Sequence, residues 1–554
     1  MTTATLAAKE RQLDWLLDEV LGPAHAAARA RHHWLVAALI ALAVGTAFGV
    51  AWLREDRGAR SAQEREDALP WIEVHGGAAG IPDTPADARA VRCFDFDDDA
   101  IERLVARCPD VEHLDFGHMD LNDRGYAVSL KVTDAGVAHL GKLRKLRSLA
   151  LGQCHEMKGE GLRVLEAVPL LESLDVTYSG IESPAVERLS RLGSLRELTL
   201  SHCMNFRGSS LAEVAKIAGL RTLRLQACTT ISAKDALQLV NAKGLRHLDL
   251  RDCQGRFRGQ RMSTGLGDDV QEAPVEDGIG ITDDVVAALS VLPLETLLLG
   301  GSESLTDAIG ESFAKMPTLR GLDVSNLPKT TGALLPVLPT RLQALWLDDN
   351  PQFEEQDLLR VPAMPDLRTL GLAGLSLQAS SLEHLLADAS LTHLRLGAVS
   401  PAGKGDLLRK QLLGRKRLPE PLPAVAATHI ARQTDLTSLE IRDGFLLDRA
   451  FLTTIAPLPR LTHLDLSASS RLMPLGSNDA LKGLAANRSL SSLKVMWCRF
   501  DADTLRAWAR MPLRQLDLFG TNVTDAEVVD AAAAWPGCVI KMPRGQRYVV
   551  PATR

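Results

Sequence analysis

The sequence predicts an α/β solenoid, in which a curved parallel sheet is covered by outer helices, preceded by one transmembrane helix. Three observations support this fold class. The phrase L-x-x-L-x-L recurs along most of the 554 residues, apolar and polar positions alternate within it, and one long apolar segment lies near the N-terminus. A fixed period of about 20 to 29 residues is typical of chains in which each repeat stacks on the next.

Residues 1–33 are expected to form an N-terminal tail with a short amphipathic helix. Its apolar side chains recur at helical spacing, at Leu13, Leu16, Leu17, Val20 and Leu21. Such a helix either docks on a partner or the membrane surface, or only leads into the segment that follows.

Residues 34–53 are predicted to be a transmembrane helix. Trp34–Leu53 contains no charged residue and no proline, and twenty residues at about 1.5 Å each match a bilayer core of about 30 Å. A cleaved signal peptide is the rival interpretation, but its apolar region would be shorter and would begin earlier. Gly45 and Gly49 form G-x-x-x-G, which predicts a weak homodimer through this helix.

We therefore expect a single-pass protein of the cell membrane. Arg29 and Arg31 precede the segment and several arginines follow it, so charge counting leaves open which side carries the repeats. Residues 54–90 are predicted to be a spacer.

The repeats are predicted over residues 91–540. Most neighbouring copies are 23 to 25 residues apart. Sixteen copies begin at Val91, Val111, Leu146, Leu171, Leu195, Leu220, Leu245, Leu294, Leu319, Leu342, Leu367, Leu391, Leu436, Leu461, Leu490 and Leu513. We number positions from the first residue of each copy.

Each copy should contain a strand, a turn and a short helix. Positions four and six are apolar and alternate with polar ones, which predicts a strand with one buried face. In the second half, Leu211, Val214 and Ile217 share one helical face, and Thr-Asp pairs such as Thr133-Asp134 and Thr524-Asp525 suit a helix N-terminus.

The pattern resembles the leucine-rich-repeat family, in its ribonuclease-inhibitor-like and cysteine-containing types, and a bacterial membrane-anchored plan. Position nine is cysteine at Cys154, Cys203, Cys228, Cys253 and Cys498. The resemblance implies that this position points inward and bonds to backbone groups. Cys203, Cys228 and Cys253 would lie on adjacent strands, so a disulfide among them stays open. The chain has no F-box-like segment, so the resemblance does not imply a ubiquitin-ligase adaptor.

Composition argues against several function classes. Net charge is −6, pI is about 6.2 and aromatic residues make up 4%, which does not favour nucleic-acid binding. The sequence has no P-loop, G-x-S-x-G or H-E-x-x-H motif, so we expect neither an enzyme nor a cofactor or metal site.

Positions three, five and seven should face outward on the concave side of the sheet and bind a protein partner of unknown identity. Mixed charge with a few aromatic or arginine anchors is typical of such faces. The candidate residues are Arg224, His247, Asp249, Arg251, Trp346, Asp348, Arg395, Arg442 and Phe519. Taken singly, each also fits a solvated strand residue.

Two insertions, at residues 254–280 and 400–424, interrupt the period, and residues 541–554 are expected to be a C-terminal tail. The sequence favours a membrane-anchored binding or scaffold module. A structural, envelope-organising protein without specific recognition, or an enzyme whose site is spread over distant repeats, are the alternatives.

Overall fold

The computed structural model describes residues 71–75, 84–116, 131–253, 280–375, 377, 379–397, 424–442, 449–467 and 481–551. Its strands are β1 Ile72–His75, β2 Ala90–Phe94, β3 His113–Asp115, β4 Ser148–Ala150, β5 Ser173–Asp175, β6 Glu197–Thr199, β7 Thr222–Arg224, β8 His247–Asp249, β9 Thr296–Leu298, β10 Gly321–Asp323, β11 Ala344–Trp346, β12 Thr369–Gly371, β13 His393–Gly397, β14 Ser438–Arg442, β15 His463–Asp465, β16 Ser492–Lys494, β17 Gln515–Asp517, β18 Val539–Lys541 and β19 Arg547–Val549.

The helices are short. The α-helices are α4 Asp98–Arg107, α5 Asp134–Ala138, α6 Ser183–Arg188, α7 Leu211–Val214, α8 Ala233–Ala236, α9 Asp283–Leu289, α10 Ile309–Phe313, α11 Glu355–Leu358, α12 Ala379–Leu386, α14 Ala424–Ala431, α15 Arg449–Ile455, α16 Ala502–Ala507 and α17 Asp525–Ala532. The 3₁₀ helices are η2 His139–Lys142, η3 Glu160–Ala167, η4 Leu189–Arg191, η5 Gly208–Ser210, η6 Leu237–Asn241, η7 Leu335–Val337, η8 Leu481–Ala486 and η9 Trp508–Arg510.

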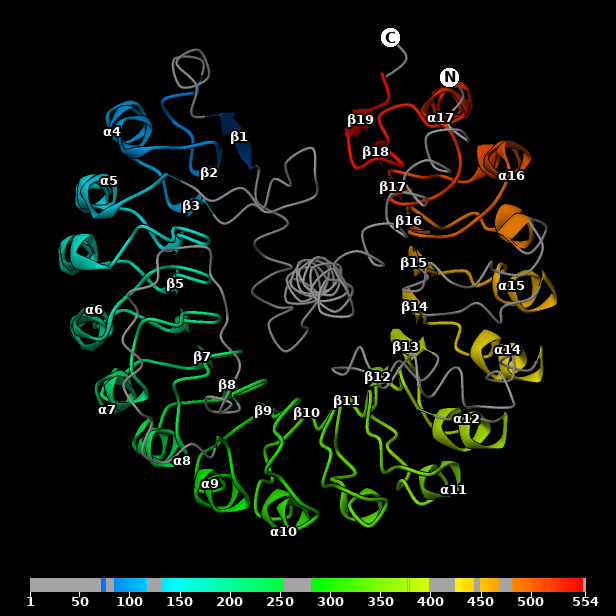
Figure 1. Cartoon of the computed structure of the whole chain (residues 1–554), viewed down its shortest axis with the longest axis horizontal. Coiled ribbons are helices and arrows are strands. Elements are labelled where there is room, and N and C mark those ends of the chain that lie inside the picture. Colours follow the sequence, from blue (N-terminus) through cyan, green and yellow to red (C-terminus); the bar gives the residue numbers. More distant parts are fainter. Residues whose placement is uncertain are drawn as a thin grey trace, which may run out of the picture.

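The described strands form one 19-stranded sheet that lines the inside of a nearly closed horseshoe, with the helices outside (Figure 1). Consecutive strands pair in parallel from β1 to β18, whereas β19 pairs antiparallel with β18. The predicted leucine-rich-repeat solenoid is therefore confirmed by the repeated phrase and the parallel sheet together.

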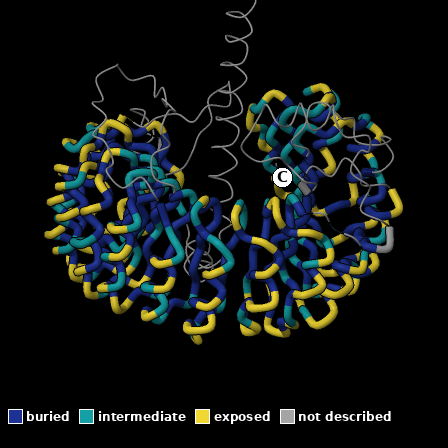
Figure 2. Tube along the Cα trace, turned by 60° about the horizontal axis from the view of Figure 1, so that its bottom comes forward, coloured by how far each residue is buried: buried dark blue, intermediate teal, exposed yellow. Residues whose placement is uncertain are grey.

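The core lies between the sheet and the helices. Position-four leucines pair in register from strand to strand, as Leu198 does with Leu223 and Leu223 with Leu248. These leucines, the α7 residues Leu211 and Val214, and Ile217, which follows that helix, belong to one continuous buried cluster. Figure 2 shows the same layering, with buried chain inside the wall and exposed chain on its outer turns.

The first copy begins at Ala88 and not at Val91. Val91 pairs with Leu114, which occupies position four of the copy that begins at Val111. Val91 therefore also occupies position four. The sequence suggested the wrong register because Val91, Phe94 and Phe96 reproduce the spacing of the phrase, and only strand pairing distinguishes the two alignments.

The sheet extends beyond the predicted repeats at both ends. Strand β1 lies in the predicted spacer, and β19 lies in the predicted tail. The N-terminal tail, Trp34–Leu53, the Gly45 and Gly49 pair and nearly all of both insertions lie outside the described residues. Within the described ranges, no helix has the length and apolar character needed to span a bilayer.

Several predicted Thr-Asp helix starts are confirmed. Thr133 accepts a hydrogen bond from the Ala135 N–H, and Thr524 forms a reciprocal capping box with Glu527. The aspartates of these pairs have a second role that the sequence did not reveal. Asp283 accepts both the N–H and the hydroxyl of Thr306 in the next repeat, at 2.9 and 2.6 Å, and so joins neighbouring repeats on the outer side.

Position nine also joins neighbouring repeats, as the family resemblance implied. Cys203, Cys228 and Cys253 donate to the position-six carbonyl of the preceding repeat, with Sγ to oxygen distances of 3.1, 3.0 and 3.1 Å. All three are buried free thiols, so the structure has no disulfide among them. Burial raises the pKa of Cys203 to about 12, which keeps its proton on sulfur to donate this bond.

Asn350 holds position nine in its repeat and makes the same connection more strongly. Its amide donates to the Val324 and Leu347 carbonyls at 2.9 and 2.8 Å, and its Oδ1 accepts the Leu327 N–H at 2.9 Å. Because all of these groups are buried, each loses its partner and stays desolvated when the amide is removed.

Asn350→Ala should therefore lower the free energy of unfolding by about 3 kcal/mol or more, since each orphaned buried group costs about 1–3 kcal/mol. Urea unfolding followed by circular dichroism measures the change. The matched control is the exposed Asn241→Ala, expected to stay within about 0.5 kcal/mol of the parent chain. Equal effects of the two substitutions would contradict the assigned role of Asn350.

Candidate partner-binding site on the concave face

A row of side chains at position five crosses the concave face, and charged members pair with neighbours. The ion pairs are Arg92 with Asp115 at 3.6 Å, Arg395 with Glu440 at 3.4 Å and Lys541 with Asp517 at 3.7 Å. Adjacent parallel strands lie about 4.8 Å apart, so side chains at one position are always within reach of the next repeat.

The candidates Asp249 and Arg251 lie in the centre of this face and are buried, each only 2% exposed. Arg251 forms a two-bond pair with Asp249, at 2.9 and 2.6 Å, and lies 3.9 Å from Asp323 on β10. The expectation that positions five and seven face solvent is thus wrong here, because opposite charges within one repeat and across the sheet satisfy each other.

Trp346 and Asp348 are also buried, at 7% and 4% exposed, although the sequence suggested an exposed aromatic. Asp348 accepts the Ala373 N–H at 2.6 Å and pairs with Arg395 at 3.0 Å. Burial alone would lower the pKa of the Arg395 guanidinium, but the carboxylates of Asp348 and Glu440 outweigh it and raise that pKa. Asp348, Arg395 and Glu440 therefore form an internal charge network.

Aspartates at position five have a backbone role that recurs along the sheet. Each accepts the N–H of position seven in its own repeat, at 2.8 to 3.0 Å: Asp175 from Thr177, Asp249 from Arg251, Asp323 from Ser325, Asp465 from Ser467 and Asp517 from Phe519. The regular strand has ended at this point, so the carboxylate supplies the acceptor that the parallel sheet no longer provides.

Burial raises the pKa of several of these carboxyl groups. It raises the pKa of Asp323 to about 7, although Arg251 opposes the shift, and it raises the pKa of Asp175 and Asp465 as well. A perturbed carboxyl in a cleft is often catalytic. Here burial accounts for the raised pKa, and the turn bond opposes it. Within the described ranges no His, Cys, Asp or Glu cluster is arranged to hold a metal.

Of the remaining candidates, Arg224 and His247 lie on the adjacent strands β7 and β8, whereas Arg442 lies on β14. Arg224 ends β7 and is half-buried, and His247 begins β8, where its Nδ1 lies 3.1 Å from the Thr296 hydroxyl. Burial lowers the pKa of His247. Arg442 ends β14 in register with Gly397, and its side chain lies outside the described part of the chain.

Phe519 lies in a cluster at the C-terminal end of the concave face, which we call the C-terminal aromatic patch: Met496, Trp497, Asp517, Phe519 and Lys541. All five are half-buried. The Trp497 and Phe519 rings meet edge to face, with centroids 5.1 Å apart, and the Lys541 ammonium lies 4.9 Å from the Phe519 ring centre.

The backbone holds this patch in place. Trp497 occupies position eight with φ +61°, and Gly520 occupies position eight of the next repeat with φ +73°. Non-glycine residues such as Trp497 also adopt this left-handed backbone at position eight, but a Cβ at Gly520 would overlap the Trp497 ring, so glycine is needed there for the space. The sequence analysis missed Trp497 because position eight was not expected to face the concave side.

Comparisons with known proteins do not assign the chain to a family. No family model and no curated protein matches the chain. Similar solved structures include an internalin from Listeria monocytogenes, with 13% identity, coverage of 77% of this chain and 83% of that one, and a TM-score of 0.31. TLR13 in complex with ssRNA13 has 17% identity, coverage of 82% of this chain and 62% of that one, and a TM-score of 0.37. Rad7 from the yeast complex with Elc1 has 16% identity, coverage of 83% of this chain and 92% of that one, and a TM-score of 0.42.

Asp323→Asn should flatten the dependence of stability on pH. The folded-state pKa of Asp323 lies above that of an unfolded aspartate, so the folded chain binds more protons between about pH 4 and pH 7. The stability contributed by this group is present at low pH and is lost as pH rises through about 7. Asparagine removes this loss while its Oδ1 still accepts the Ser325 N–H.

The measurement is thermal unfolding of both chains from pH 5 to pH 8. The midpoint of the parent should fall relative to that of the variant as pH rises. The exposed Asp503→Asn is the control and should track the parent. A constant difference between Asp323→Asn and the parent would show that Asp323 does not titrate in this range.

Proposed function

We propose that this chain is a membrane-anchored scaffold that binds a protein partner through the C-terminal aromatic patch on its concave face. The observation that carries the proposal is the Trp497–Phe519 pair, which is half-buried and held in place before any partner binds. A rigid aromatic surface loses little conformational entropy on binding, and binding energy concentrates on such anchors.

The surroundings of the two rings support a protein ligand. Met496 adds a flexible apolar side chain, while Asp517 and Lys541 supply opposite charges beside the rings. An apolar centre with a charged, paired rim is the usual arrangement of a protein-binding surface. The exposed His463 and Gln515 side chains extend the same face with polar groups.

The buried centre of the concave face is a poorer candidate for partner binding than the C-terminal aromatic patch. Asp249, Arg251, Asp348 and Arg395 already satisfy one another, so a partner would gain little by displacing those bonds. We therefore assign recognition to the repeats of β16 to β18, with Phe519 retained from the sequence-based candidates.

A photo-crosslinking amino acid placed at Phe519 of the full chain should form one discrete adduct in the native cells, because the side chain lies in the proposed contact. The same amino acid at Val529, exposed on the outer helix α17, is the matched control and should not form that adduct. Mass spectrometry identifies the crosslinked protein.

Trp497→Ala in the Phe519-labelled chain should abolish the adduct without unfolding the repeats, since the indole is half-buried. Identical adducts from Phe519 and Val529, or an adduct that survives Trp497→Ala, would remove the concave patch as the binding site.

We also propose that Trp34–Leu53 anchors the chain, because its length and apolar character match a bilayer. Full-length chain should remain in the membrane pellet after alkaline carbonate washing, whereas a chain lacking residues 34–53 should be released. Protease added to intact cells or spheroplasts then shows which side carries the repeats. Release of the full-length chain by carbonate would refute the anchor.

A further inference from the structure

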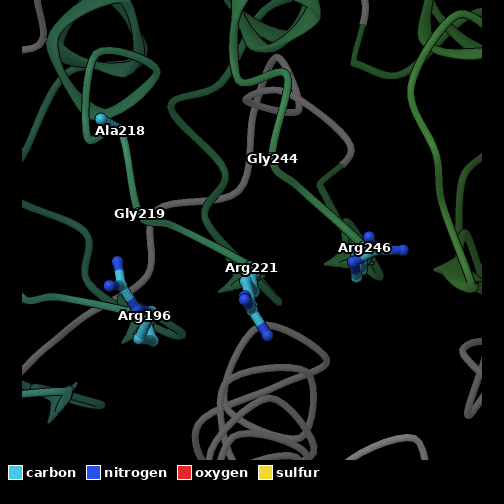
Figure 3. Close-up of a pocket in the computed structure, with 6 residues that line it drawn as sticks. All are labelled: Arg196, Ala218, Gly219, Arg221, Gly244 and Arg246. Carbon is cyan, nitrogen blue, oxygen red and sulfur yellow. The ribbon is translucent and has the colours of Figure 1, made fainter.

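A pocket of about 330 Å³ lies on the rim of the solenoid, where the chain enters strands β6, β7 and β8. It is lined by Arg196, Ala218, Gly219, Arg221, Gly244 and Arg246, and Figure 3 shows the three arginines on successive strands. The three lie on adjacent rungs, because the N–H of Arg221 donates to the Arg196 carbonyl and that of Arg246 to the Arg221 carbonyl, both at 2.8 Å.

These arginines occupy position two, where the charges of the preceding repeats alternate in sign from Glu112 through Arg147 to Glu172. Arg147 pairs with both Glu112 and Glu172, at 3.6 and 3.1 Å, and Arg246 pairs with Glu295 at 2.7 Å. Arg196 and Arg221 fall between these pairs. Both are exposed, and within the described residues neither guanidinium pairs with a carboxylate. Among the described residues, this part of the rim therefore has two adjacent arginines that form no ion pair.

Two glycines line the pocket where other repeats have a side chain. In the residue just before position one, the Ser194 and Thr318 hydroxyls donate to the Leu171 and Leu294 carbonyls of the preceding repeats, both at 2.7 Å. Gly219 and Gly244 hold this place in the two repeats between the three arginines. A Cβ at Gly219 would overlap the Arg196 guanidinium, which lies across the missing side chain.

We propose that this pocket binds the phosphate group of a phosphomonoester. A phosphomonoester carries a charge of about −2 near neutral pH and offers three acceptor oxygens, which matches two unpaired guanidinium forks and the adjacent Arg246. The volume of the pocket is near the lower end of the range of about 300–1,000 Å³ for small-molecule sites. This site is separate from the C-terminal aromatic patch and does not depend on the proposed partner.

The test is calorimetric titration of the full chain in detergent with two probes that share one headgroup, glycerol 3-phosphate and dihexanoyl phosphatidic acid. Saturable binding that weakens with added salt is expected for at least one probe. Equal affinity for both indicates a soluble phosphomonoester, and preference for the acylated probe indicates a lipid headgroup. Either result supports the phosphate site.

Two variants test separately the positive charge and the free volume of the pocket. Arg221→Gln should weaken binding about ten-fold or more, since it removes a charge-assisted hydrogen bond. Gly244→Ser keeps every charge but places a hydroxymethyl group in the pocket, as in the Ser194 repeat, without meeting a guanidinium, and should weaken binding by a similar factor.

The matched control is Arg147→Gln, which removes the same charge from the same position at a paired site and should leave affinity within about two-fold. The absence of saturable binding to both probes would overturn the proposal. So would an equal loss of affinity in Arg147→Gln and Arg221→Gln, because general charge attraction would then explain the binding. Circular dichroism confirms that each variant is folded.

Discussion

The contact between neighbouring repeats is the constraint on which the rest of this structure depends. A single repeat has one strand of three to five residues and one short helix, too little to bury its own leucines. Stacking buries positions one, four and six, and polar side chains then satisfy the backbone where the strands end. Asn350 and the position-nine cysteines reach backward to the preceding repeat, while Asp283 accepts bonds from the following one.

The same constraint decides which parts of the concave face are free to bind. Position five serves the fold where it holds aspartate, because the carboxylate completes the strand end, and it serves charge balance where Arg395 lies between Asp348 and Glu440. Side chains used in this way are poor candidates for recognition. The concave face is more apolar where Phe519 and Trp497 lie, and the rim is more positive where Arg196, Arg221 and Arg246 follow one another.

Sequence patterns predicted the repeats well because each copy repeats the same burial requirement. They failed where two alignments satisfied the same pattern, as at Val91, since only pairing with Leu114 places it at position four. Sequence patterns also give no information on how an outward position in one repeat contacts the other repeats. Asp249, Arg251 and Trp346 lie at outward positions, but their burial depends on groups in other repeats, which no local pattern records. Position eight gave no periodic signal, so Trp497 was missed.

By itself the sequence determined the solenoid, fifteen of the sixteen phrase copies, the position-nine cysteines and the apolar segment Trp34–Leu53, because these follow from the spacing and character of residues along the chain. The tertiary structure decided which outward charges are neutralised, where two aromatic rings meet and where glycines line a pocket beside two arginines that pair with no described carboxylate. Those features depend on which side chains adjacent repeats bring within a few ångströms of one another, and that proximity is set by stacking.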